Sequence, residues 1–159
     1  MSTGVRPNAE TAVAKGFQFI QFRQHTPDEQ EAVVAYLRWV RHRPSPLHRE
    51  ADGSLDAAAL RGKQLFESPR VGCSSCHPAP LFTTRRIYDV GTRAPEDRRD
   101  AFDTPSLREL YRTAPYLHSG AAATVRDVLT TFNPGDRHGI TSHLTREQLD
   151  DLIAYLLTL

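Results

Sequence analysis

The stretch Cys73-Ser74-Ser75-Cys76-His77 decides the fold of this chain. Its spacing, C-x-x-C-H, is the attachment signature of a c-type haem. Each thiol is placed to add to one vinyl group of the porphyrin, and the imidazole of His77 is placed under the ring to bind the iron. The chain has 2 cysteines, so the motif uses both of them. The sequence therefore predicts one covalent haem c on Cys73 and Cys76, with His77 as the proximal ligand.

Two other kinds of site use a C-x-x-C pair, and each needs features that this sequence does not offer. A zinc site would need a second Cys/His pair with ligand spacing. A thioredoxin-like pair would need a strand before it and a helix after it, whereas residues 67–72 read as a turn. Haem attachment is therefore the favoured interpretation.

Length and composition fit one domain that contains a buried apolar cofactor. The chain has 159 residues, of which 39% are hydrophobic, somewhat below the usual range for globular chains. A porphyrin would supply the apolar surface that the side chains lack. The formal net charge of +1 gives no reason to expect a nucleic-acid or membrane-surface protein. No window approaches the ~18 consecutive apolar residues of a membrane-spanning helix.

The first twenty residues do not resemble a signal peptide, because their polar residues are scattered and no apolar central region is present. The motif nevertheless resembles the bacterial C-x-x-C-H motifs to which haem is attached outside the cytoplasm. We therefore expect a periplasmic or extracellular protein. The missing signal then indicates an excised piece or a mature form.

Capping signals and apolar periodicity predict an all-helical domain without a strand-rich run. Extended segments are expected only near residues 81–84 and 87–91, and residues 93–100 form a solvated charged loop. The Pro-rich stretch after residue 43 reads as a linker. The expected helices cover residues 10–24 (a short or irregular one), 27–43, 54–66, 104–113, 124–132 and 145–159.

Gly62 lies inside one of these expected helices. A glycine there is less favourable than alanine by about 1 kcal/mol, so a packing reason is expected. We predict that the helix containing Gly62 crosses the last helix closely, near Leu152 and Tyr155. The alternative is a neutral glycine on the surface.

The chain resembles a class I cytochrome c in three stretches: Gly62-Lys63-Gln64-Leu65-Phe66, the C-x-x-C-H motif, and the closing run Asp151-Leu152-Ile153-Ala154-Tyr155-Leu156. The resemblance implies an all-α cytochrome c fold with covalently attached haem. In that fold the first and last helices cross at a glycine and an aromatic residue.

A narrower resemblance covers roughly residues 60–159. It is similar to the second haem domain of bacterial di-haem cytochrome c peroxidases and the MauG group, which is the electron-transfer half of those proteins. The peroxide-reacting haem of that family belongs to the other domain. The stretches that carry this resemblance are Pro80-Leu81-Phe82-Thr83, Asp89-Val90-Gly91-Thr92, Thr104-Pro105-Ser106-Leu107-Arg108 and Ala114-Pro115-Tyr116-Leu117-His118-Ser119-Gly120.

Two departures from that family change the expected haem chemistry. A single C-x-x-C-H excludes a two-haem relay within these residues. In the family's electron-transfer domain, a methionine ligand lies at a fixed distance after the histidine that corresponds to His118. The residue of this chain at that distance is Phe132, which cannot bind iron. The only methionine is Met1. His/Met ligation, which raises the reduction potential, is therefore not expected.

The N-terminal part resembles a piece of another module. The run Ala32-Val33-Val34-Ala35-Tyr36-Leu37-Arg38 is similar to the closing helix of a cytochrome c domain. We therefore divide the chain into an N-terminal helical extension, residues 1–46, and a mono-haem cytochrome c domain, residues 47–159. The extension would then be the last helix of a preceding module.

His138 is the predicted sixth ligand of the iron. In mitochondrial-type cytochromes c, which the closing run resembles, the methionine ligand lies thirteen residues before the first Asp of that run. The same count back from Asp151 reaches His138. Gly139 follows and would let the backbone pass close to the porphyrin. The rivals are His118, His143 and an open iron.

Other side chains are weaker candidates for the haem pocket. A guanidinium binds carboxylates bidentately, so Arg108 is a candidate partner of a haem propionate, with a plain surface arginine as the alternative. Arg85 and Arg86 are weaker candidates for the same role. As in the family it resembles, the chain would use Tyr116 and His118 to line the pocket.

The sequence is compatible with two function classes. The favoured one is electron transfer by a single six-coordinate, bis-His haem, whose partners are other redox proteins or haem domains. The second is a peroxidase-related enzyme or a diatomic-gas-binding domain with an open or weak distal site. Binding of carbon monoxide to the reduced protein distinguishes them.

Overall fold

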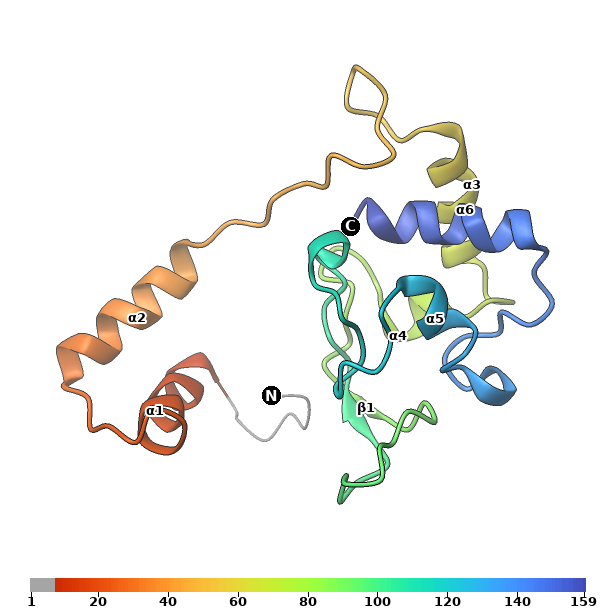
Figure 1. Ribbon diagram of the computed structural model, residues 1–159. Helices are drawn as coiled ribbons and strands as arrows, with labels where there is room; N and C mark the ends of the chain where they lie inside the picture. The colour runs from red at the N-terminus through yellow and green to blue at the C-terminus, as the bar shows by residue number, and fades with distance from the viewer. Residues whose placement is uncertain (1–7) are drawn as a thin grey trace. The chain divides into compact units, whose positions relative to one another are not determined.

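The computed structural model describes residues 8–159 and divides them into two compact units, one ending at His42 and the other beginning at Arg43. Each unit is described separately. The first contains two helices, and the second contains the cysteine motif and the remaining elements (Figure 1).

The first unit pairs α1, Ala9–Phe19, with α2, Pro27–Trp39. Thr26 and Glu29 form the expected capping box of α2, with Pro27 at the first helical position. The helix ends four residues earlier than predicted because Val40 leaves the helical conformation, at ψ 128°. The expected helix or irregular segment at residues 10–24 is α1, which ends before Ile20.

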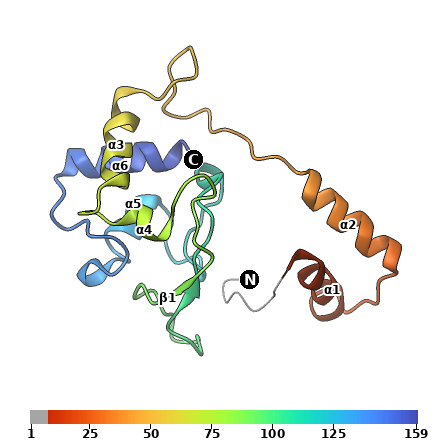
Figure 2. The same ribbon diagram turned by 180° about the vertical axis from the view of Figure 1, so that it is seen from behind.

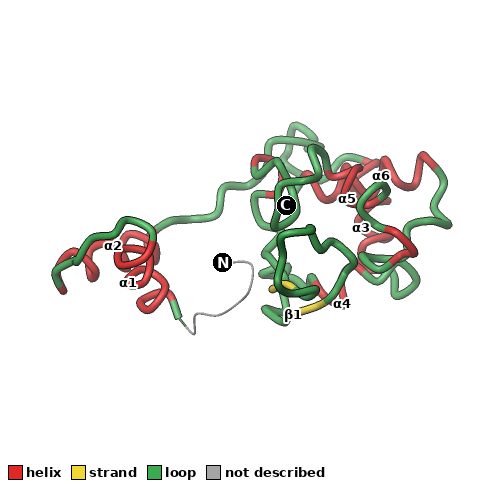
Figure 3. The backbone as a smooth tube through the Cα atoms, turned by 60° about the horizontal axis from the view of Figure 1, so that its bottom comes forward, coloured by secondary structure: helices red, strands yellow, loops and turns green. Residues whose placement is uncertain are grey.

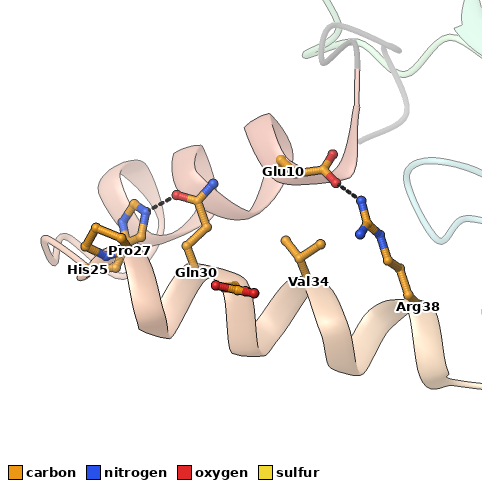
Figure 4. Close-up of a pocket in the computed structure, with 7 residues that line it drawn as sticks. Glu10, His25, Pro27, Gln30, Val34 and Arg38 are labelled. Atoms are coloured by element: carbon orange, nitrogen blue, oxygen red, sulfur yellow. Dashed lines mark hydrogen bonds and ion pairs between the residues drawn. The ribbon is translucent and has the colours of Figure 1, made fainter.

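A pocket of about 430 Å³ lies between side chains of the two helices. Val34, whose side chain is buried, lies between a hydrogen bond from His25 to Gln30 and an ion pair of Arg38 with Glu10 (Figure 4). Val34 is the only buried residue in the described helices of this unit. The unit therefore has little apolar core of its own.

The second unit is built around the crossing of α3, Ala57–Glu67, and α6, Arg146–Leu157. Figures 1 and 2 show the two helices side by side from opposite directions. Asp56 caps α3, and a capping box of Thr145 and Gln148 opens α6. Between them run α4, Cys73–Cys76; β1, Ile87–Tyr88; β2, Phe102–Asp103; η1, Leu110–Arg112; α5, Val125–Leu129; and η2, Pro134–Asp136.

Gly62 lies at this crossing, as predicted. A Cβ atom built on Gly62 would lie 1.9 Å from the carbonyl oxygen of Asp151 and 2.9 Å from Cβ of Tyr155. Only a residue without a side chain lets the two backbones approach so closely. The ring of Phe66 packs edge-on against Tyr155, with centroids 5.3 Å apart. The two crossed helices therefore form the framework that supports the loops of the unit.

An ion pair also joins the two helices at this crossing. Asp151 is buried, and Arg61 donates to its two carboxylate oxygens through Nε and Nη2, both at 2.7 Å. This fork-to-fork pairing compensates the carboxylate for its lost hydration. The hydrogen bond to Asp151 is the largest cause of the raised pKa of Arg61. Beneath it, the core is made by the side chains of Phe66, Val71, Val125, Leu129, Leu152, Tyr155, Leu156 and Leu159.

Long irregular segments fill most of the second unit, as the green tube of Figure 3 shows. The predicted helix over residues 104–113 is wrong. Thr104 does not cap a helix, because its N–H and hydroxyl both bond to the carbonyl of Arg86, at 2.9 and 2.8 Å. Those bonds continue the antiparallel pairing of β1 with β2. Only the single turn η1 is helical in this stretch.

The helix predicted over residues 124–132 is shorter than expected. Its capping box of Thr124 and Asp127 is present, but α5 ends at Leu129. Thr130 leaves the helical conformation, and its hydroxyl donates to the carbonyl of Arg126 at 2.8 Å. Such bonds from threonine to the preceding turn compete with helix continuation.

Within residues 8–159, no helix combines the length and apolar character needed to cross a membrane.

Candidate haem site

The cysteine motif forms a single helical turn. Gly72 precedes α4 with φ +82°, a left-handed conformation that glycine adopts without strain. The N–H of His77 closes the turn on the carbonyl of Cys73, at 3.0 Å. Both cysteines are half-buried and form no disulfide. The turn therefore presents two thiols and one imidazole from five consecutive residues.

The surroundings of Cys73 argue against a redox pair. Burial raises the pKa of the Cys73 thiol to about 11, whereas thioredoxin-like cysteines have lowered pKa values. The element before the motif is the helix α3 and a turn, and the helix within it is one turn long. The strand and longer helix of a thioredoxin-like site are not at these positions.

His77 is buried, with 8% of its surface exposed, and its ring is held by backbone. Nδ1 lies 2.9 Å from the carbonyl oxygen of Phe82, which can only accept a hydrogen bond. The proton is therefore on Nδ1, and the lone pair of Nε2 is free to bind a metal. Burial lowers the pKa of His77, which favours this neutral, ligating form.

His138 faces His77. The centroids of the two imidazole rings are 6.5 Å apart, with 37° between the ring planes. Two imidazoles on opposite sides of one metal ion, each bonded at about 2 Å, have ring centres roughly 6 Å apart. The observed separation therefore suits two axial ligands of one iron.

The environment of His138 also fits a ligand. Burial, with a smaller contribution from His77, lowers the pKa of His138 to about 4, so the ring is neutral. Its Nδ1 is buried and has no hydrogen-bond partner among the described residues. An unpaired buried polar atom of this kind is unfavourable by about 1–3 kcal/mol. The two histidines and the two thiols thus form a set of groups that fits a covalently attached haem.

His138 belongs to the distal loop, residues 133–142, which lies directly against the cysteine motif. The N–H of Ile140 donates to the carbonyl of Val71 at 2.9 Å. Gly139 has φ +86°, and a Cβ built on it would lie 3.7 Å from Sγ of Cys73. The backbone at Gly139 therefore lies close to the first thiol, and its predicted approach to the porphyrin stays a prediction.

The two rival histidines lie in other surroundings. His143 is exposed and lies two residues before Thr145, the N-cap of α6. His118 is mostly buried; its Nε2 lies 2.6 Å from a carboxylate oxygen of Asp97, and its ring stacks on Phe102 with centroids 3.6 Å apart. His138 alone of the three has a ring contact with His77 among the described residues. Met1 lies outside the described residues.

Two of the remaining sequence candidates, Arg108 and Tyr116, bond to backbone carbonyls of the protein. Arg108 is exposed, and its Nε donates to the carbonyl of Pro80 at 3.0 Å. The hydroxyl of Tyr116 donates to the carbonyl of Leu110 at 3.0 Å, and burial raises its pKa. Arg85 and Arg86 are exposed. The propionate contact of Arg108 and the pocket roles of Tyr116 and His118 stay predictions.

Sequence reasoning missed two groups that hold the site residues, the carbonyl of Phe82 beside His77 and the side chain of Asn133 beside His138. It also missed the carboxylate of Asp97, which is the partner of His118. A backbone carbonyl leaves no signal in a sequence. An Asn followed by a Pro is itself a turn signal, so Asn133 and Pro134 indicate only a turn before His138.

The fold, the C-x-x-C-H turn and the facing histidines together define a c-type cytochrome domain. The protein-family model described as cytochrome c matches residues 59–159, and this chain belongs to that family, whose members carry covalently bound haem c. The predicted all-α cytochrome c fold is confirmed, as is the resemblance to di-haem cytochrome c peroxidases and the MauG group.

The relatives include catalytic proteins and a subunit of a complex. The gamma subunit of hydrazine synthase from Kuenenia stuttgartiensis is 35% identical over 183 aligned positions, covering 89% of this chain and 51% of that protein. The methylamine utilization protein MauG of Methylorubrum extorquens is 30% identical, covering 80% of this chain and 42% of its own. The cytochrome-c peroxidase IdrP1 of a Pseudomonas species is 27% identical, covering 81% and 48%.

A solved structure supports the same grouping. A structure of Kuenenia stuttgartiensis hydrazine synthase matches with a TM-score of 0.83 and 31% identity, covering 94% of this chain and 61% of that chain. Because the family model begins at residue 59, this wider match extends into the residues before it. The chain spans about half the length of the curated relatives it matches.

Proposed function

We propose that this chain transfers single electrons through one haem c, attached at Cys73 and Cys76 and bound axially by His77 and His138. The facing pair of neutral imidazoles, with His77 buried and His138 half-buried, carries this proposal. Bound there, the haem would supply an iron that changes reversibly between its ferrous and ferric states. The chain's own residues would fix that iron from both sides.

The two histidines have separate tasks in this proposal. His77, oriented by the carbonyl of Phe82, fixes the proximal side. His138 would hold the haem from the distal side, and peroxide or a diatomic gas would then find no open position. Ligation without methionine is expected to give a lower potential than His/Met ligation, because an axial methionine raises it. Such a site suits the relay of electrons between other carriers.

The partners proposed are other redox proteins or haem domains, in a periplasmic or extracellular location. Support comes from the relatives, one of which is named as a subunit of hydrazine synthase. We also propose that residues 1–46 form a helical extension to a mono-haem domain at residues 47–159. The division into compact units at His42 and Arg43 supports a boundary in this region.

Covalent attachment of one haem is the first prediction. The mass of the intact holoprotein should exceed that of the polypeptide by one haem, and acid–acetone should not extract the pigment, because thioethers survive that treatment. Mass spectrometry and the absorbance of the extract measure both. The double variant Cys73→Ala/Cys76→Ala, which keeps His77, is the control and should release any bound haem. A wild-type pigment that moves into the organic phase would disprove attachment.

A further inference from the structure

A buried amide lies at the base of the distal loop. Asn133 has 6% of its surface exposed and directly follows the turn that ends α5. Its Oδ1 accepts the N–H of His138 at 2.7 Å, and its Nδ2 donates to the carbonyl of Gly139 at 2.8 Å. Nδ2 also donates to Oγ1 of Thr141 at 3.0 Å. One side chain thus bonds to the backbone on both sides of the His138 α-carbon.

The hydrogen bonds fix the orientation of this amide. The N–H of His138 can only donate, so the oxygen of Asn133 must face it. The carbonyl of Gly139 can only accept, so the amide nitrogen must face that group. The hydroxyl of Thr141 donates to the carbonyl of Leu129 at 2.7 Å and therefore accepts from Asn133. Rotating the amide by half a turn would break all three bonds.

The rest of the loop is tied down further from the ligand. Asp136 accepts the N–H groups of Thr141 and Ser142, each at 3.0 Å, and the hydroxyl of Ser142. These bonds brace the outer side of the loop, and the bond from Ile140 to Val71 holds the loop against the cysteine turn. Among the described residues, Asn133 is the one whose side chain bonds to the backbone of His138 and Gly139.

We infer that Asn133 is the positioning residue for the distal ligand, holding the backbone at His138 and Gly139 so that the imidazole stays directed at the iron. This inference rests on the proposed ligation by His138. The segment needs such a hold because Gly135, Asp136 and Gly139 all have positive φ angles. A loop with these conformations has many alternatives once its side-chain bonds are removed. Loss of Asn133 would therefore let His138 leave the iron more often.

The test measures how often the ligand leaves. Carbon monoxide binds ferrous iron only while the sixth position is free, so its limiting binding rate in stopped flow reports detachment of His138. The variant Asn133→Leu has a similar size and none of the three bonds. Since each lost bond weakens the hold by up to about tenfold, the limiting rate should rise by tenfold or more. Asn133→Asp keeps the acceptor for His138 and should lie between Asn133→Leu and wild type.

Two controls separate positioning from general stability. Ser142→Ala removes the bond from the Ser142 hydroxyl to the carboxylate of Asp136, on the outer side of the loop. Because that bond is exposed and does not reach the backbone of His138 or Gly139, the carbon monoxide rate should stay within about twofold. Thermal unfolding is measured for every variant. A fall in melting temperature without a faster carbon monoxide rate would overturn the inference, because the amide would then support only the fold. If Asn133→Leu does not yield holoprotein, the comparison of Asn133→Asp with Ser142→Ala decides the same question.

His138→Ala, measured in parallel, separates the positioning role of Asn133 from the proposed ligation by His138. If it opens the iron while both Asn133 variants stay as slow as wild type, the ligand assignment stands and the role of Asn133 is wrong. If His138→Ala stays closed to carbon monoxide, the ligand assignment fails and the role of Asn133 fails with it. A graded series, with Asn133→Asp between wild type and Asn133→Leu, supports the inference.

Discussion

His138→Ala is expected to convert a low-spin, closed haem into one that binds carbon monoxide at once. The wild-type imidazole is half-buried and neutral, and its centroid lies 6.5 Å from that of His77. Alanine leaves an apolar gap in its place and offers no ligand. The expected spectrum is high-spin, or low-spin only with an added ligand such as imidazole. Absorption spectra of the reduced protein, with and without carbon monoxide, provide the measurement.

The two rival histidines supply matched controls for this experiment. His143→Ala changes an exposed residue and should leave the spectrum unaltered. His118→Ala removes the partner of Asp97 and the ring stacked on Phe102, so it should loosen that loop while the iron stays six-coordinate. If His138→Ala stays low-spin and still refuses carbon monoxide, His138 is not the ligand. If the wild-type protein itself binds carbon monoxide freely, the peroxidase-related or gas-binding alternative gains support.

Gly62→Ala is expected to destabilise the haem domain strongly, although it adds a single methyl group. That group would lie 1.9 Å from the carbonyl oxygen of Asp151, which is backbone and cannot rotate away. The helices α3 and α6 must therefore separate, and the fit of Phe66 against Tyr155 is lost with them. We expect a loss of about 3 kcal/mol, at the upper end for overpacked sites, and Gly62→Val should lose at least as much. Thermal unfolding followed by circular dichroism measures both.

Gly16→Ala is the matched control, because it makes the same change in a helix where nothing lies within 4 Å of the new methyl group. Alanine is the better helix former, so this variant should keep or slightly raise stability. An unchanged melting temperature for Gly62→Ala would mean that the crossing is looser than described, and the assignment of Gly62 to the helix contact would be wrong.

The parts of the fold that were predictable are those with local causes. Thr26, Thr124 and Thr145 each form a capping box with a residue three positions on, so the starts of three helices can be read from four-residue patterns. Gly62 was informative for a related reason, since a glycine within a helix indicates that something lies close to it. The count back from the last helix, taken from a family that the closing run resembles, led to His138, whose ring lies 6.5 Å from that of His77; its ligation of the iron stays a prediction.

The parts that were not predictable depend on distant backbone partners. Residues 104–107 carry a helix-opening pattern, yet Thr104 bonds to Arg86 and Leu107 to Phe82, whose positions no local pattern specifies. The hydrogen bonds of Asn133 reach residues five, six and eight positions along an irregular loop. Sequence patterns with helical or strand periodicity cannot describe such a segment. The ring contact of His118 with Phe102 depends on the same kind of non-local placement.

The bracing of the distal loop by Asn133 and Asp136 has a consequence for how such a protein can change. With His138 as the proposed ligand, side chains other than the ligand hold the backbone, so the identity of the ligand would be separated from the shape of the loop. A single exchange at residue 138, for example to methionine, could then alter the reduction potential by changing the axial ligand alone, while the surrounding hydrogen bonds stay as they are. The loop would keep its conformation whichever side chain residue 138 carries, so a substitution at this one position would change the driving force for electron transfer through the domain.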